Sequence, residues 1–227
     1  MPGDGTGVLI ETNTQIDLIS KESYNYINQG IKGIRLMKPQ VKQPEAGQQL
    51  AKNIQANERF IKREYPNENF ISDITQLQLK NKYSKGIIIP ENVKIAESRI
   101  PINSEQRRTL RKELRQAGIL ARQGNSVYLT PEPGMYKKRT TDAIVNGVPF
   151  EFRNITGKSR QIEQEFSDAK IKDKAANVFM NIDSDISRYE VRRRIVMVLD
   201  RHLDYTREIV VSFQGKITYF WDTGDFR

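Results

Sequence analysis

The sequence contains no cysteine and only one histidine, His202. The absence of cysteine excludes a disulfide scaffold, a thiol nucleophile and a thiolate-bound metal. A single histidine also excludes a histidine-rich metal site and a nuclease that needs two histidines. Composition alone therefore removes several classes of structural and catalytic site.

Long apolar runs are also missing. A helix that crosses a bilayer needs roughly 20 apolar residues, whereas the longest run here, Gly86–Ile89, is stopped by Pro90. The N-terminus, Met1–Gly5, is acidic and glycine-rich rather than basic and then apolar, so we expect no signal peptide. Hydrophobic residues make up 37% of the 227 positions. We therefore expect a compact core from part of the chain only.

Positive charge is in excess. The chain carries 37 lysines and arginines against 28 aspartates and glutamates, which gives a net charge of +9 and a pI near 9.6. A protein with this balance attracts polyanions, and nucleic acid, RNA or DNA, is the commonest such partner.

Composition and periodicity divide the chain into three predicted parts. Residues 1–45 mix polar residues and glycine and predict a flexible tether. Residues 46–103 predict a small, mostly helical region for delivery or docking. Residues 104–227 predict an α/β domain.

The pattern in 46–103 is the weaker one. A first helix is predicted from the spacing of Leu50, Ile54 and Ile61, and Pro66 ends it. A second helix is predicted to cover Phe70, Ile74 and Leu77. The apolar residues 86–90 predict a short strand or an apolar loop.

The C-terminal part has clearer signals. Asn103 or Ser104 can cap a helix, and Gly124 stands where a glycine ends one. Asn146-Gly147 and Gln214-Gly215 predict two β-hairpins. The predicted order of elements is α-β-β-β-α-β-α-β-β, which is an αβββαβ core followed by a long helix and a C-terminal hairpin. The predicted ranges are 104–123, 126–130, 142–145, 148–154, 159–174, 177–182, 187–205, 209–213 and 216–221.

The first hairpin places two carboxylates together. A two-residue turn at Asn146-Gly147 pairs Val145 with Val148 and, further along, Asp142 with Glu151. Because strand residues alternate between faces, one face of the hairpin is apolar and should enter the core. The residues of that face are Ala143, Val145, Val148, Phe150 and Phe152.

The other face carries Asp142, Glu151 and Arg153. Directly opposite residues have Cβ atoms about 5 Å apart, so the two carboxylates repel unless a cation lies between them. Mg²⁺ or Mn²⁺ suits oxygen ligands of this kind. The alternative is a solvent-facing side in which Arg153 and nearby lysines relax the repulsion.

Two helical residues add to this interpretation. Glu113 lies beside the apolar stripe of the first predicted helix, on the side that faces the sheet, where a carboxylate is costly unless it is paired or ligated. Lys170 follows Phe166 by four residues, near the buried edge of the next helix. A lysine close to a metal-bound water can stabilise the charge that develops on a phosphate. Each residue alone also fits a surface position.

Five segments then carry a family resemblance: Leu120–Gly124, Asp142–Gly147, Glu151–Arg153, Asp168–Lys170 and Ala176–Ile182. With the acidic helix residue and the Asp-x8-Glu-x-Arg spacing, they resemble the PD-(D/E)XK nucleases. More narrowly, they resemble the C-terminal tRNA-nuclease domains of contact-dependent inhibition (CdiA) toxins and related modules of phage and mobile-element proteins.

The resemblance implies an active site made of Glu113, Asp142, Glu151 and Lys170, with Glu113, Asp142 and Glu151 as ligands of Mg²⁺ or Mn²⁺. It also implies action in the bacterial cytoplasm, after delivery into a target cell or on a phage or mobile element, and a cognate immunity protein with an acidic contact surface. One departure is that Arg153 stands where the family has lysine. Arginine keeps its proton and cannot act as a base, although it can hold a phosphate.

Basic residues around this site are candidates for substrate binding. Lys137, Lys138 and Arg139 precede the hairpin, and Arg192 and Arg193 lie on the last predicted helix. They are either a track for the phosphate backbone or a solvated surface.

The sequence thus predicts metal-dependent hydrolysis of RNA, with tRNA favoured. A second hypothesis is a protein that keeps the fold and binds nucleic acid, or serves as a phage or mobile-element component, without chemistry. A third is a metal-independent ribonuclease of the barnase, colicin or RelE type that uses His202 as a general acid or base, with Glu151 and Arg153.

Overall fold

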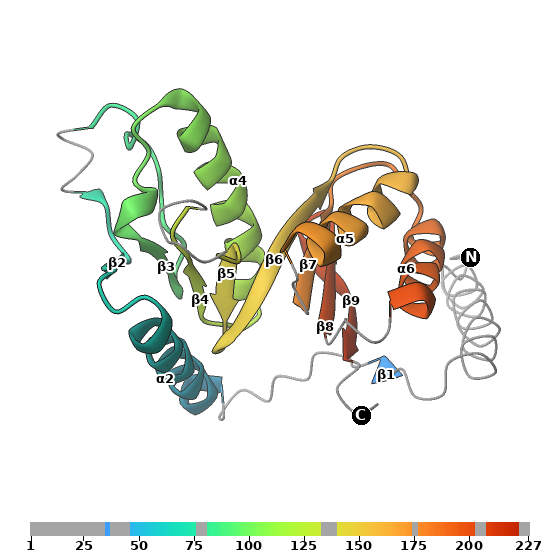
Figure 1. Ribbon diagram of the computed structural model, residues 1–227, viewed down its shortest axis with the longest axis horizontal. Helices are drawn as coiled ribbons and strands as arrows, with labels where there is room; N and C mark the ends of the chain where they lie inside the picture. The colour runs from blue at the N-terminus through green and yellow to red at the C-terminus, as the bar shows by residue number, and fades with distance from the viewer. Residues whose placement is uncertain are drawn as a thin grey trace, which may run out of the picture.

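The computed structural model describes residues 35–36, 46–75, 81–132, 140–173, 177–202 and 208–222. They form a mixed α/β fold (Figure 1). The helices are α2 (Ala46–Glu64), α4 (Ser104–Ala121), α5 (Arg160–Asp173) and α6 (Arg188–His202), with a short 3₁₀ helix, η2 (Glu97–Arg99). The strands are β1 (Arg35–Leu36), β2 (Phe70–Ile71), β3 (Val93–Ala96), β4 (Val127–Leu129), β5 (Ala143–Val145), β6 (Val148–Ile155), β7 (Asn177–Ile182), β8 (Glu208–Phe213) and β9 (Lys216–Asp222).

These strands form one 9-stranded sheet in the order β1-β9-β8-β7-β6-β5-β4-β3-β2. The long strand β6 lies in the middle, antiparallel to β5 and parallel to β7. Because β7 and β8 are also parallel, β6-α5-β7-α6-β8 makes two parallel crossovers, each through one helix. The order of elements over 104–227 is the predicted one.

Helix α4 begins and ends at the predicted signals. The Asn103 side chain caps the helix by accepting a hydrogen bond from the Gln106 N–H. Three residues after the last helical residue, Gly124 has φ +83°, a conformation that glycine adopts without strain. The buried stripe contains Leu110, Leu114, Ala117 and Ala121, as predicted.

The apolar face of the first hairpin packs against α4. Ala143, Val145, Phe150 and Phe152 belong to one core cluster with Leu110 and Leu114 of that helix. Val148 is the exception among the five predicted core residues, since it is 38% exposed. It is the first residue after the turn, at the end of the hairpin.

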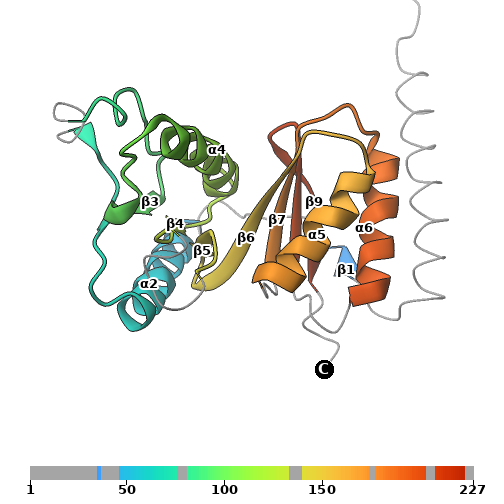
Figure 2. The ribbon, with the colours of Figure 1, turned by 45° about the horizontal axis from the view of Figure 1, so that its top comes forward.

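Helices pack over two parts of the opposite face of the sheet. Helix α2 packs over β4 and β5, where Ile61 and Tyr65 contact Tyr128 and Ile144. Helices α5 and α6 cover β6, β7 and β8 with a separate cluster that includes Phe166, Met180 and Ile195. Figure 2 shows α2 and α4 on opposite sides of β4, and α5 between β6 and α6. The polar side of the hairpin therefore lies between α2 and α5.

The structure corrects the prediction for residues 46–103. Helix α2 is confirmed, and residues 86–90 form a loop, one of the two predicted alternatives. Phe70–Ile71 form a strand where the second helix was predicted to begin, whereas Thr75 is helical. Strand β3 was not predicted. It pairs in parallel with β4, so the sheet continues across position 103, and this region supplies strands as well as helix. Strands of two and four residues are too short to show a periodicity, which is why the sequence pattern missed them.

The predicted tether, 1–45, lies outside the described residues except for β1, which pairs with β9. Leu77 also lies outside them. Within the described part of the chain, every helix is too short or too polar to span a bilayer.

Candidate active site

The turn at Asn146-Gly147 sets the position of the two hairpin carboxylates. Both turn residues have positive φ, 53° and 85°, as a tight hairpin turn requires. The predicted register is confirmed from Val145 opposite Val148 to Ala143 opposite Phe150. Asp142 immediately precedes β5, and its Oδ2 accepts a hydrogen bond from the Phe152 N–H at 2.8 Å. Asp142 is thereby fixed beside the strand that carries Glu151.

The Arg153 guanidinium joins the carboxylates. Its Nη1 lies 3.6 Å from Asp142 Oδ2 and 3.2 Å from Glu151 Oε2. Its Nε lies 3.7 Å from Glu165 Oε2 on α5. The Glu151 side chain is only 4% exposed. A buried carboxylate needs such a partner, because water cannot solvate it there.

Glu113 lies on α4, the helix that packs against the apolar face of the hairpin. It forms an ion pair with Arg99 of η2, whose side chain is 2% exposed and which also donates to the Thr130 carbonyl. Burial raises the pKa of Glu113 to about 7, although the positive charge of Arg99 lowers it. The negative charges of Asp142 and Glu132 raise this pKa further. Glu113 and Asp142 therefore interact electrostatically. We call Glu113, Asp142 and Glu151, with Arg99 and Arg153, the carboxylate site.

The carboxylate site meets part of what a divalent metal needs. Asp142 and Glu151 offer the oxygen donors that Mg²⁺ and Mn²⁺ prefer, and both already face one cationic group. Within the described residues, however, no group of three or more aspartates, glutamates or histidines is arranged to hold a metal ion. The oxygen donors of Asp142 and Glu151 therefore suit such a metal ion, whereas Glu113 is held by its ion pair with Arg99.

The other predicted residues fall elsewhere. Position 170 is in α5, but the side chain of Lys170 lies outside the described residues, and so does that of His202, the last residue of α6. Lys137, Lys138 and Arg139 also lie outside them. Arg192 and Arg193 are on α6, which α5 separates from β6 (Figure 2). Arg193 Nε lies 3.2 Å from Glu190 Oε2, so one of the two predicted phosphate contacts already has a carboxylate partner.

Sequence reasoning missed Arg99 and Glu165. Arg99 follows two polar residues, Glu97 and Ser98, so no apolar periodicity marks it as buried. Glu165 precedes the buried Phe166 on α5 just as Glu113 precedes the buried Leu114 on α4. The same argument that singled out Glu113 would therefore have found Glu165.

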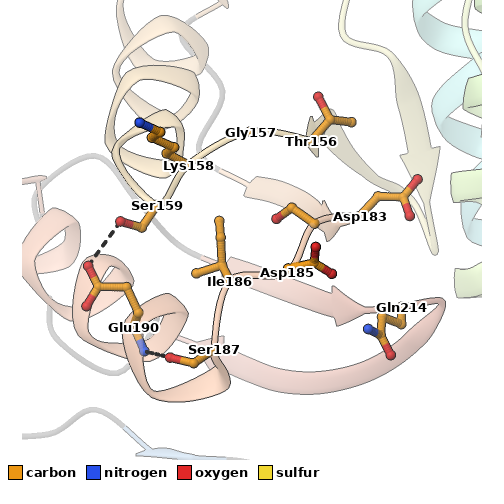
Figure 3. A pocket seen from close by; sticks show the side chains of 11 residues that line it. Thr156, Gly157, Lys158, Ser159, Asp183, Asp185, Ile186, Ser187, Glu190 and Gln214 are labelled. Carbon is orange, nitrogen blue, oxygen red and sulfur yellow. Dashed lines mark hydrogen bonds between the residues drawn. The ribbon is translucent and has the colours of Figure 1, made fainter.

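A separate pocket of about 840 Å³ lies where β6, β7 and β8 end and where α5 and α6 begin (Figure 3). Ser159 Oγ donates to Glu190 Oε1 at 3.0 Å, and the Glu190 N–H donates to Ser187 Oγ at 3.2 Å. Lys158 is accompanied by acidic side chains in this lining. With three carboxylates, Asp183, Asp185 and Glu190, against Lys158, this lining is predominantly acidic and does not suit a phosphate ligand. The candidate chemistry therefore stays with the carboxylate site.

Comparison of the chain with protein-family models, curated proteins and solved structures found no match.

Proposed function

We propose that this protein hydrolyses phosphodiester bonds of RNA, with tRNA the favoured substrate, by using Mg²⁺ or Mn²⁺. One observation carries the proposal. Asp142, just before β5, and Glu151 of β6 converge on one guanidinium, and the Glu113 carboxyl from α4 is electrostatically coupled to Asp142. These contacts link the predicted acidic residues pairwise, Glu151 with Asp142 through Arg153, and Asp142 with Glu113 through charge. The choice of RNA over DNA comes from the resemblance to tRNA-nuclease toxin domains.

Each residue has a role that its surroundings suit. Asp142 and Glu151 would hold the metal ion, which when bound supplies a Lewis acid and lowers the pKa of a water molecule. Glu113, with a pKa of about 7, exists in both protonation states near neutral pH and can give or accept a proton. The guanidinium of Arg153 can bind a phosphate of the substrate. Lys170 would add positive charge, as the resemblance implies.

The second candidate is a nucleic-acid-binding protein that retains the fold without catalysis. The observation that favours it is the position of Arg153, which makes ion pairs with both carboxylates where related nucleases have lysine. In this case Asp142 and Glu151 serve to anchor Arg153, and the hairpin binds no metal ion.

Cleavage of total tRNA tests the proposal, in Mg²⁺, in Mn²⁺ and in EDTA, on a denaturing gel. We expect discrete products that need metal and that disappear in Asp142→Asn/Glu151→Gln, which preserves the shapes of the side chains. The control, Glu91→Gln/Glu105→Gln, removes the same charge from two exposed positions and should cleave normally.

Three results contradict the proposal. They are products in EDTA, undiminished cleavage by the double variant, and no products in any condition. Products in EDTA would direct attention to His202. Absence of products, together with no Mn²⁺ binding by calorimetry, would favour the non-catalytic candidate.

A further inference from the structure

Helix α4 presents a second polar surface next to the carboxylate site. A groove of about 380 Å³ runs along the helix, and apart from Ser104 only cationic residues line it. We call these residues, Arg107, Arg108, Arg111, Lys112 and Arg115, the α4 cationic face. Their spacing of i, i+1, i+4, i+5 and i+8 places them on one stripe of the helix.

Most of this charge has no acidic partner. Among the described residues, no carboxylate lies within ion-pair distance of Arg107, Arg108, Arg111 or Lys112. Arg115 lies 3.4 Å from the exposed Asp183. Arg99, Arg153 and Arg194 differ from these residues, since each of them makes an ion pair. Like charges gathered in this way repel, and a bound polyanion removes that repulsion.

Two guanidinium groups of the face are held in place by the neighbouring loop. Arg107 Nη2 donates to the Lys85 carbonyl at 2.6 Å, and Arg111 Nη2 donates to the Gly86 carbonyl at 3.3 Å. Each arginine keeps further N–H groups for a ligand. Restricting these side chains before binding lowers the entropy that association costs.

We propose that the α4 cationic face binds the sugar-phosphate backbone of the nucleic acid. The stripe is about 12 Å long at 1.5 Å per residue. Backbone phosphates advance about 3.4 Å per nucleotide along a duplex, so the stripe matches about three phosphates of one strand. An acidic protein fits less well, because a protein interface has an aromatic or apolar centre and this groove has only cations and a serine.

The position of the face relates it to the proposed chemistry. Glu113 follows Lys112 directly and lies about 100° further around the helix axis, where it meets Arg99. A strand bound along the stripe is thus brought near Glu113 of the carboxylate site. The inference rests on the proposed function for the class of ligand, nucleic acid, but does not require that cleavage occurs.

Binding of a fluorescein-labelled tRNA, measured by anisotropy in EDTA between 50 and 250 mM salt, tests this proposal. The test variant is Arg108→Gln/Arg111→Gln/Lys112→Gln. Each phosphate contact contributes about 0.7 to 0.9 to the slope of log K against log salt, so the slope should become shallower by about 2 to 3. The Kd at 0.1 M salt should rise about 100-fold.

The matched control, Lys52→Gln/Arg59→Gln/Lys62→Gln, removes the same charge from exposed positions of α2 and should change the Kd less than about threefold. Arg108→Lys/Arg111→Lys keeps the charge of the face and should preserve the slope. Circular dichroism establishes that all variants are folded. An unfolded triple variant would be replaced by the single variant Arg108→Gln, with an expected slope change of about 1.

An equal loss in the α2 control would overturn the proposal, because attraction would then reflect net charge and not this face. No binding of tRNA by the wild-type protein would overturn it as well. Equally tight binding of poly-L-glutamate would assign the face to acidic proteins instead. Tight binding through α4 without cleavage in Mg²⁺ or Mn²⁺ would support this inference and contradict the proposed function. Normal cleavage by the triple variant in 0.1 M salt would support the proposed function and contradict this inference.

Discussion

Ionisation of Glu113 should cost folding stability as the pH rises. The Glu113 side chain is 14% exposed, and burial raises its pKa from 4.5 to about 7. The folded state therefore holds the proton more tightly than the unfolded state. The contribution of Glu113 to stability is complete below pH 4.5 and is lost as the pH rises through about 7.

The magnitude follows from the same two pKa values. A carboxyl whose pKa moves from 4.5 to about 7 on folding destabilises the protein by about 3 kcal/mol once it is ionised. Domains of ordinary size are stable by only about 5–15 kcal/mol, so the loss should be easy to detect. Glu113→Gln resembles the protonated side chain and has no ionisation. Relative to wild type, the variant should gain about 3 kcal/mol between pH 4.5 and pH 8.5.

Urea unfolding of both proteins at pH 4.5 and pH 8.5 measures this difference. Comparing the two pH values cancels the fixed effect of the amide on packing and on Arg99. The matched control is Glu105→Gln, which removes a carboxylate from an exposed position of the same helix. Parallel pH profiles of wild type and Glu113→Gln would refute the reasoning and would mean that Arg99 outweighs burial. A Glu113 carboxyl titration by NMR with a midpoint below pH 5 would refute it directly.

Three further predictions concern Arg153 and the contact between α2 and the hairpin. Arg153→Ala should bind Mn²⁺ about tenfold more tightly in calorimetry, because the substitution removes the cation beside Asp142 and Glu151. Unchanged or weaker binding would show that Asp142 and Glu151 do not form a metal site. Asn57→Ala should lower the free energy of unfolding by about 2 kcal/mol. The buried Asn57 side chain accepts a hydrogen bond from the Gly147 N–H at 2.6 Å and donates one to the Ser126 carbonyl at 2.9 Å. A loss under about 0.5 kcal/mol would disprove that role. Gly147→Ala should lower the free energy of unfolding by about 1–3 kcal/mol more than Gly215→Ala in the same urea assay. Both glycines have φ near +80°, but only at Gly147 would a Cβ lie 2.8 Å from an atom of α2. Equal losses would show that this close approach does not affect stability.

Local chemistry in the sequence determined the hairpins, the helix ends and the order of elements over 104–227. The Asn146-Gly147 turn has positive φ at both residues, which these two residue types accept, and a two-residue turn of this kind sets the register of β5 and β6. The same register brings Asp142 and Glu151 together, and period-two alternation separates them from Ala143 and Phe150. These features depend on neighbours in sequence, which is why pattern alone was sufficient.

Only the tertiary structure decided the surroundings of the carboxylates. Strand β3 joins β4 through a pairing that spans more than thirty positions, and four residues carry no signal for it. That pairing places Arg99 next to Glu113, and the burial which results sets the Glu113 pKa at about 7. Helix α2 covers Ile144 on the face that the sequence pattern left to polar groups. A sequence specifies which side chains are acidic, but desolvation and charge partners depend on packing between distant segments, and so the protonation of the candidate site is a property of the fold.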